Sequence, residues 1–441
     1  MATTTGMATM TPPRIARAQR SALVLLVLAG TLNYVDRATL SVANPLIRQE
    51  LGLSIADMGL LLSAFLWAYA FAQLPGGALL DRLGPRRVLG AGLVLWSVAQ
   101  AAAGFVAGFW QFVLTRALLG LGEAPMFSGA VRVVRDWYNV RGRGLPTGIW
   151  NCTSSLGPTI APPLLTALMV SFGWRWTFIL MGAVGVVIGV LWFAIYREVE
   201  EAGLTAEERH HLTEGEEEPP TRRVTLAEWR RLFAFRTTWG MIIGFFGIVY
   251  LVWLYQAWLP GYLEIQRHMG LVKTGWVASI PYAFGVVGSV GGGWVADRLM
   301  ARGLSPINSR KVPVIVGLVG MGVFTYVAAV VASDTAAVAC IAGAVFCAGC
   351  SSGMSWALAS VVAPESCTAS LGSIMNFGGY LGGALAPTVT GFIVQATGSF
   401  VPALVSASAV ALLAALAYLL IVPNRAIGFA ELVPDARPAT A

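Results

Sequence analysis

The sequence predicts an all-α integral membrane protein with twelve transmembrane helices, arranged as two related six-helix bundles. Hydrophobic residues make up 56% of the chain and charged residues 12%, whereas a soluble domain carries about 25% charged residues. A transmembrane helix needs roughly 20 mostly apolar residues, and twelve runs meet that requirement. They are 21–46, 57–80, 88–108, 110–132, 145–170, 176–196, 238–263, 274–298, 312–332, 336–360, 369–396 and 401–422.

The distribution of basic residues predicts the orientation of these helices. If the N-terminus lies in the cytoplasm, most of the 29 Lys and Arg residues fall in inner loops and tails. The outer loops then contain only Arg48, Arg175, Arg267 and Lys273. Cytoplasmic loops carry such an excess of Lys and Arg, so both termini are expected inside. The net charge of +7 follows from this topology, and we do not expect nucleic-acid binding.

The apolar runs form two sets of six, which divides the chain into five segments. A polar linker rich in Glu and Arg separates the two sets, and a short amphipathic helix is expected near its end, at 226–235. The segments are a cytoplasmic tail (1–20), an N-terminal bundle (21–196), a cytoplasmic linker (197–237), a C-terminal bundle (238–422) and a second cytoplasmic tail (423–441).

Two pairs of similar stretches relate the two halves. GGALLDRL in the first half recurs as GGWVADRL in the second, and IWNCTSSLGPTIAP at 149–162 aligns with IMNFGGYLGGALAP at 374–387. The second alignment makes Asn151 and Asn376 equivalent across a pseudo-two-fold axis. Parallel repeats about an axis normal to the membrane are typical of transporters, whose substrate site lies between the repeats near the midplane.

The stretch GGALLDRLGPRRVL has the spacing G-x-L-x-D-R-x-G-x-R-R and follows the second apolar run. Gly77 is expected to allow close packing, Asp81 to cap a neighbouring helix and Gly84 to turn the chain. This spacing resembles the signature loop of the major facilitator superfamily, which implies a role in conformational gating. The residues concerned are Gly77, Asp81, Arg82, Gly84 and Arg86, with Asp297 and Arg298 in the second copy.

Four further stretches resemble the anion:cation symporter family within that superfamily: NYVDRATLSVANPLI, RALLGLGEAPMFSGAVRVVRDWY, SFGWRWTF and AWLPGYL. The similarity extends over essentially all twelve helices and looks closest to bacterial proton symporters for sugar acids, of the galactonate and glucarate type. It implies a multi-pass protein of the bacterial inner membrane that moves a small organic anion with protons. TSSLGPTIAPP resembles the antiporter motif of the fifth helix, but Ala161 and Pro162 replace its Gly pair.

Four ionisable residues lie deep within the apolar runs: Asp36, Arg37, Arg116 and Glu123. A charge at the bilayer centre costs about 2.5–3.5 kcal/mol even on the insertion scale, so four lipid-facing charges would cost roughly 10 kcal/mol. They are therefore expected to face a cavity and to pair with one another. Arg116 and Glu123 are two helical turns apart, about 10 Å along the axis. Their partners must come from elsewhere, and the first helix supplies Asp36 and Arg37.

A stripe of polar residues runs along the first helix at spacings of three or four: Asn33, Arg37, Ser41 and Asn44. Such a stripe is expected of a helix wall that faces water or substrate. The resemblance implies that Asp36 and Glu123 carry proton coupling. It also places Arg37 and Arg116 in the same charged site, where we expect them to bind the anion. The alternative is a buried salt-bridge network that only holds the N-terminal bundle together.

The C-terminal bundle has no ionisable residue deep in its apolar runs, so neutral groups are expected to recognise the hydroxyl groups of the substrate. The candidates are Gln256, Ser355, Trp356 and Asn376 from this bundle, with Tyr34, Tyr69 and Asn151 from the N-terminal bundle. The resemblance favours Asn376 and Tyr34 over the others.

These patterns predict a secondary active transporter that imports an organic anion, best matched by a sugar acid, by proton symport with alternating access. A carrier of aromatic or other carboxylates, or an anion exchanger, is the alternative on the same fold. A membrane enzyme or sensor is weakly supported, because all three His residues lie in loops and both tails are short. No cofactor or metal is expected, since Cys347 and Cys350 have no His or second Cys pair nearby. The protein is expected to be a monomer.

Overall fold

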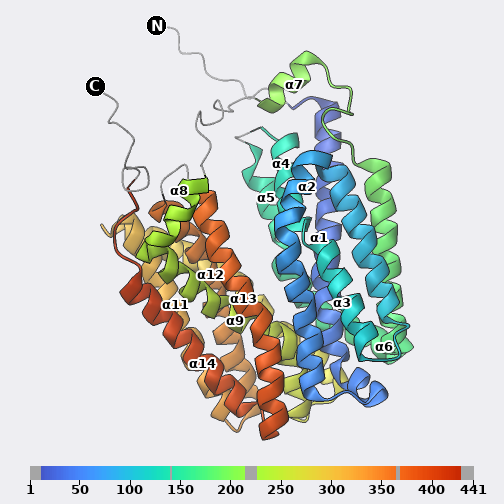
Figure 1. Cartoon of the computed structure of the whole chain (residues 1–441), viewed down its shortest axis with the longest axis vertical. Coiled ribbons are helices and arrows are strands. Elements are labelled where there is room, and N and C mark those ends of the chain that lie inside the picture. The colour runs from blue at the N-terminus through green and yellow to red at the C-terminus, as the bar shows by residue number, and fades with distance from the viewer. Residues whose placement is uncertain (1–10, 140–141, 214–225, 364–367, 429–441) are drawn as a thin grey trace.

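The structure is a computed structural model of the whole chain, and it describes residues 11–139, 142–213, 226–363 and 368–428. Within these ranges all regular secondary structure is helical. Figure 1 shows two helical bundles side by side, one coloured blue to green and the other yellow-green to red. The all-α class predicted from the sequence is therefore confirmed.

The N-terminal bundle is built from helices α1 to α6, two of which each contain two of the predicted runs. Helix α2 bends at Gly84 and α6 bends at Gly173, where φ is 76° and 81°. Glycine reaches these left-handed angles without the steric cost of a Cβ, so the chain turns sharply there, as predicted for Gly84. The bounds are α1 Pro13–Leu51, α2 Ile55–Ala103, α3 Phe109–Glu123, α4 Met126–Trp137, α5 Gly144–Asn151 and α6 Thr153–Ile195.

The C-terminal bundle is built from α9 to α14, and each helix covers one predicted run. The bounds are α9 Arg236–Ile265, α10 Leu271–Ala301, α11 Pro306–Val330, α12 Asp334–Val362, α13 Thr368–Thr397 and α14 Val401–Leu416. A π-helical turn, Ala417–Ile421, extends α14. These elements lie within or close to the predicted runs because long apolar stretches have few alternatives to a helix in a membrane.

The linker contains two short helices, α7 (Ala206–Thr213) and α8 (Leu226–Arg231), and a 3-10 turn follows at Leu232–Ala234. The second of these helices lies where the amphipathic segment was expected. Helix α7 was not predicted, although Thr205 and Glu208 give a start signal. The Thr205 amide donates to Glu208 Oε2 at 2.9 Å, and the Glu208 amide donates to Thr205 Oγ1 at 3.2 Å. This is a capping box.

Nine helical stretches in the described part of the chain are long and apolar enough to cross a membrane. One of them, Leu145–Ile195, contains two predicted runs. The runs 88–108 and 274–298 are helical but are not among these nine stretches. The number of twelve spans, the segment boundaries and the cytoplasmic position of the termini therefore stay predictions.

The two bundles meet through α2 with α13, α6 with α10 and α1 with α9. Across this seam the Ser41 hydroxyl donates to the Ala257 carbonyl at 2.6 Å, and the Thr388 hydroxyl lies 2.7 Å from the Ser63 hydroxyl. The backbones also approach closely, because a Cβ added at Gly59 would lie 2.7 Å from the Pro387 carbonyl oxygen. In Figure 1 the ribbons diverge toward the end that carries α7 and α8 and converge toward the opposite end.

Candidate substrate and proton site

A buried ion pair joins α1 to α3 in the N-terminal bundle. Nε of Arg37 donates to Oε2 of Glu123 at 2.7 Å, and the exposed fractions of the two side chains are 9% and 0%. The sequence had predicted that these residues would need partners from another helix. Because the pair is almost fully removed from solvent, breaking it without a substitute would leave an uncompensated buried charge.

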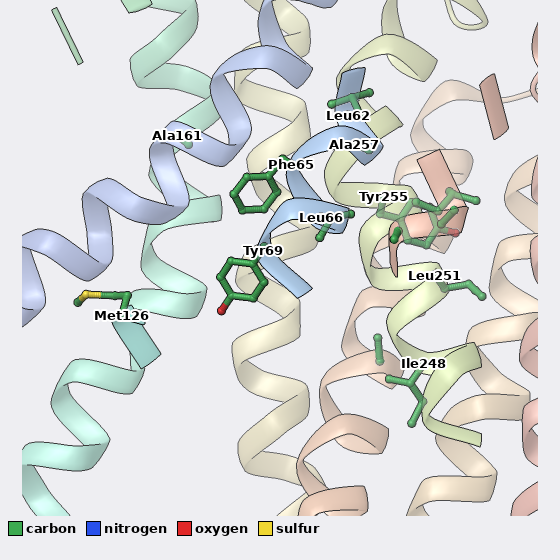
Figure 2. Close-up of a cluster of buried hydrophobic side chains, with 14 of the residues drawn as sticks. Leu62, Phe65, Leu66, Tyr69, Met126, Ala161, Ile248, Leu251, Tyr255 and Ala257 are labelled. Atoms are coloured by element: carbon green, nitrogen blue, oxygen red, sulfur yellow. The ribbon is translucent and has the colours of Figure 1, made fainter. Parts of the chain in front are cut away.

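Aromatic rings surround the Arg37 guanidinium. Its central carbon lies 5.0 Å from the ring centroid of Tyr34, 5.1 Å from that of Phe65 and 4.9 Å from that of Tyr69. Trp253 of the other bundle follows at 5.9 Å. Figure 2 shows the Phe65 and Tyr69 rings projecting from the same side of α2. These distances are in the range of cation–π attraction, so the guanidinium is held at the boundary between the bundles.

The second pair of predicted charges is arranged differently, because Asp36 and Arg116 form no direct hydrogen bond. Both carboxylate oxygens of Asp36 are buried and find no hydrogen-bond partner among the described residues, and the same holds for Nε and Nη1 of Arg116. Oε1 of Glu123 is also unsatisfied. Buried polar atoms are nearly always hydrogen-bonded, so such a cluster is suited to accept protons, water or a polar ligand.

A small cavity adjoins these charges where the bundles meet. Its volume is about 30 Å³, which is room for about two water molecules. Both bundles line it, with Tyr34, Arg37, Ala38, Ser41, Val42, Leu62, Phe65, Arg116, Pro158 and Pro162 on one side and Trp253, Gln256, Ala257, Pro260 and Tyr282 on the other. A six-carbon sugar acid is larger than this cavity, so the surrounding helices must separate before such a molecule can bind there.

Tyr380 on α13 is a site residue that sequence reasoning missed. Its hydroxyl donates to the Tyr69 hydroxyl at 3.4 Å, and the two ring centroids are 5.2 Å apart. It therefore connects the C-terminal bundle to the residues around Arg37. The signal was present in the sequence, because Tyr380 follows the predicted Asn376 by four residues and so lies on the same face of the helix.

Trp96 is the second missed residue. It is fully buried, its indole nitrogen has no hydrogen-bond partner among the described residues, and it is an electrostatic neighbour of Asp36. No sequence pattern points to it, since a Trp in an apolar run is usually a packing residue. It therefore places a buried N–H donor of α2 in the neighbourhood of Asp36.

The cavity includes only some of the neutral residues predicted from the sequence. Tyr34 and Gln256 line it, and Tyr69 lies beside it. Ser355 is turned to α14, where it accepts a hydrogen bond from the Tyr418 hydroxyl at 3.0 Å. Asn151, Trp356 and Asn376 do not line the cavity. Asn151 is exposed at the end of α5, and Asn376 is half-buried. Trp356 is 45% exposed and packs edge-on against Phe245.

The signature stretch forms a polar junction around the bend at Gly84. The Glu198 carboxylate approaches Gly84 and accepts the Arg86 backbone N–H at 3.1 Å. Nη1 of Arg86 donates to Glu201 at 2.7 Å. Burial raises the pKa of Glu198 above its usual value. Glu198 therefore satisfies an orphan amide where the helix restarts, a role that was not predicted from the sequence.

The other residues of the signature stretch make fewer contacts. The side chain of Asp81 lies outside the described residues. No described atom lies within 4 Å of a Cβ added at Gly77, so the close packing expected there is wrong; at Gly76 such a Cβ lies 3.6 Å from Pro125. The side chains of Arg82, Asp297 and Arg298 are exposed.

The geometry described here, two helical bundles around a buried charged site, agrees with comparisons to known proteins. The family model of the Major Facilitator Superfamily matches residues 26–387. The chain belongs to this superfamily. It is therefore a membrane transporter and not an enzyme, and it is a multi-pass protein of the bacterial inner membrane.

Three named relatives are similar over nearly the whole chain. The chain is 44% identical to the probable L-galactonate transporter of Escherichia coli K12, over 93% of this chain and 90% of the relative. It is 33% identical to a D-galactonate transporter of Escherichia coli O6:H1, over 91% of this chain and 94% of the relative. It is 34% identical to a probable galactarate/D-glucarate transporter of Bacillus subtilis, over 90% of each chain.

Solved structures agree on the fold. A bacterial homolog of the human lysosomal transporter Spinster, in an inward-facing and occupied conformation, matches with a TM-score of 0.76 over 90% of this chain and 96% of that one, at 18% identity. A D-xylose–proton symporter matches with a TM-score of 0.74 over 92% and 98%, at 14% identity.

Proposed function

We propose that this transporter imports a sugar acid together with protons, by alternating access between the two bundles. The observation that carries the proposal is the Arg37–Glu123 ion pair beside the unsatisfied Asp36 and Arg116, next to a cavity that both bundles line. The named sugar-acid transporters among the relatives support the choice of substrate class.

The two arginines are the proposed anchors of the substrate carboxylate. Both guanidinium groups lie over the Phe65 ring, at 5.1 Å for Arg37 and 5.4 Å for Arg116, so they are close enough to act on one anion. Guanidinium groups bind carboxylates through two parallel hydrogen bonds. Nε and Nη1 of Arg116 have no partner among the described residues, so Arg116 is the first anchor.

Glu123 couples the anion to the proton by competition for Arg37. While Glu123 is ionised, its carboxylate occupies Nε of Arg37 at 2.7 Å. Protonation removes the negative charge and weakens this bond, which frees the guanidinium for the carboxylate of the substrate. Asp36 is the second proposed proton carrier, because both of its buried carboxylate oxygens lack a hydrogen-bond partner among the described residues.

Neutral residues of the C-terminal bundle are the proposed hydroxyl ligands. Gln256 lines the cavity, and Asn376 shares a face of α13 with Tyr380, which reaches Tyr69 of the other bundle. The proposed closure of the bundles around a bound sugar acid brings Asn376 toward its hydroxyl groups. Asn151, Ser355 and Trp356 stay candidates for a conformation in which the helices have moved.

Uptake into proteoliposomes tests the proposal. Radiolabelled galactonate and glucarate are offered with the vesicle interior at about pH 8 and the exterior at about pH 6, and then without the gradient. We expect accumulation of a sugar acid only with the pH gradient, and loss of accumulation when an ionophore dissipates it. Uptake that ignores the pH gradient and requires substrate inside the vesicles would identify an exchanger and refute proton symport.

A further inference from the structure

A second cavity lies on the N-terminal bundle, where α1 begins and α6 ends. Its volume is about 340 Å³, and it shares no lining residue with the central cavity. It is lined by Arg14, Arg17, Ala18, Ser21 and Ala22 of α1, by Trp137, and by Ile195, Tyr196, Arg197, Ala202 and Leu204. The proposed transport cycle gives it no role.

The cavity has a strongly positive lining. Three of its residues are arginines, and none is acidic. Arg14 and Arg17 are one helical turn apart on α1, so both face the same side. Arg197 comes from the opposite wall, where its Nη1 donates to the carbonyls of Phe193 and Tyr196 at 3.0 and 3.2 Å. The cavity is therefore suited to an anion.

The carboxylate of Glu208, which approaches Arg14, does not neutralise this charge. Glu208 lies 4.0 Å from Arg14, whose side chain is 63% exposed, and exposed ion pairs of this kind contribute little. Glu208 is also engaged in the capping box at the start of α7. Of the other carboxylates in this region, Glu201 and Asp136 are paired with Arg86 and Arg132. Glu198 accepts the Arg86 backbone N–H, and Glu200 is exposed.

The apolar side of the cavity continues into a lipid-facing surface. Ile195 lines the cavity and is 47% exposed. Leu191, Val187 and Val184 precede it at steps of three or four residues along α6 and are 39%, 59% and 49% exposed. This stripe of exposed aliphatic side chains runs from the arginines along the bundle, and a soluble anion would make no use of it.

We propose that this cavity binds the headgroup of an anionic phospholipid of the inner leaflet. The phosphate is held by Arg17 and Arg197, and one acyl chain follows the stripe from Ile195 to Val184. The basic residues lie at the end of the bundle predicted to face the cytoplasm, which is where such headgroups lie. Basic pockets between helices at this membrane surface have the chemistry that anionic headgroups require.

Lipid binding to purified protein in detergent tests the proposal, with phosphatidylglycerol as the probe and phosphatidylethanolamine as the neutral-headgroup comparison. We measure bound lipid by native mass spectrometry and thermal unfolding with and without lipid. The variants are Arg17→Gln, Arg17→Gln with Arg197→Gln, and the control Arg20→Gln. Arg20 is an exposed arginine of the same helix that does not line the cavity.

We expect phosphatidylglycerol to bind and to raise the unfolding temperature of the wild type. Each basic residue at an anionic lipid surface contributes about fivefold in affinity, so the double variant should bind roughly 30-fold more weakly. Arg20→Gln should bind like the wild type. If the double variant unfolds at a lower temperature than the wild type without lipid, the single variant Arg17→Gln is the test. Its affinity for phosphatidylglycerol should then be about fivefold lower than that of the wild type.

Three results would overturn the proposal. Equal losses in Arg20→Gln and Arg17→Gln would show a diffuse effect of surface charge. Equal binding of phosphatidylethanolamine would remove the role of the anionic headgroup. Equal stabilisation by glycerol phosphate, which has no acyl chain, would identify a site for a soluble anion in place of a lipid.

Discussion

Glu123→Gln should uncouple transport from the proton gradient. In the wild type Oε2 of Glu123 accepts from Nε of Arg37 at 2.7 Å with both side chains buried. Glutamine keeps an acceptor oxygen of similar reach but carries no charge and cannot bind or release a proton. We therefore expect substrate-for-substrate exchange to persist, while accumulation driven by a pH gradient is lost.

The size of the effect on affinity follows from the same contact. A hydrogen bond to a charged group contributes about 1.5–3 kcal/mol and a neutral one about 0.5–1.5 kcal/mol. Glutamine should therefore compete for Arg37 less strongly by about 1.4 kcal/mol, which is about tenfold in affinity for the anion. The variant's tenfold gain in affinity for the anion should appear at about pH 8, where the wild-type carboxylate competes more strongly for Arg37.

The pH dependence has a definite sign. If one proton is taken up with each anion, wild-type affinity falls as the pH rises, by at most about tenfold per pH unit. The Glu123→Gln variant should show a flatter profile between about pH 6 and pH 8. Calorimetric titration measures affinity, and counterflow and gradient-driven uptake are compared in the same vesicles. Glu207→Gln, in the exposed helix α7, is the control and should behave like the wild type.

Persistent accumulation by Glu123→Gln up a pH gradient would refute this reasoning. Asp36 would then be the remaining proton carrier in the site. A loss of both exchange and binding would instead show that the carboxylate is needed to build the site, and the competition model would be wrong.

Three further substitutions have definite expected outcomes. Arg37→Ala should abolish anion binding in calorimetry, because Glu123 loses the ion-pair partner that the structure gives it and the anion loses an anchor. Near-normal affinity would exclude this role. Asn376→Ala should weaken substrate binding by about 1–3 kcal/mol, the cost of an unsatisfied buried hydroxyl, and should leave its pH dependence unchanged; normal binding with an altered pH response would contradict the proposed roles of the two bundles. Gly84→Ala should lower the free energy of unfolding by about 1–3 kcal/mol, because φ is 76° and Glu198 occupies the space that a Cβ needs. Gly77→Ala is the matched control and should be nearly neutral. An equal loss of stability in both variants would refute the strain at Gly84.

Apolar patterning was sufficient to predict the helices. Each predicted run is helical over most of its length, because twenty consecutive apolar residues cannot leave backbone groups unsatisfied in a bilayer. The pattern could not separate a loop from a bend. Gly84 and Gly173 turn the chain within continuous helical elements, and only the backbone angles distinguish such a turn from a longer connection.

The charged site was predictable in part for the same physical reason. Burying a charge is costly, so Asp36, Arg37, Arg116 and Glu123 were conspicuous in the sequence, and the structure pairs Arg37 with Glu123. Aromatic residues are inconspicuous in apolar runs, which is why Trp96 and Tyr380 were missed. Ser355 illustrates the opposite error, because a polar side chain on a helix is also used to bond a neighbouring helix, here through Tyr418.

The seam between the bundles has a consequence for the energetics of transport. Between described residues its hydrogen bonds are neutral ones, such as the Ser41 hydroxyl with the Ala257 carbonyl and the Thr388 hydroxyl with Ser63. The charged Arg37 guanidinium meets the other bundle through the ring of Trp253. Each hydrogen bond contributes only about 0.5–1.5 kcal/mol, and no ion pair between residues that the structure describes crosses the seam, so salt has little to screen there. The hydrogen-bond part of the cost of opening this end is therefore small enough for ligand binding energy to supply. The equilibrium between closed and open forms should consequently be sensitive to substrate and nearly independent of ionic strength.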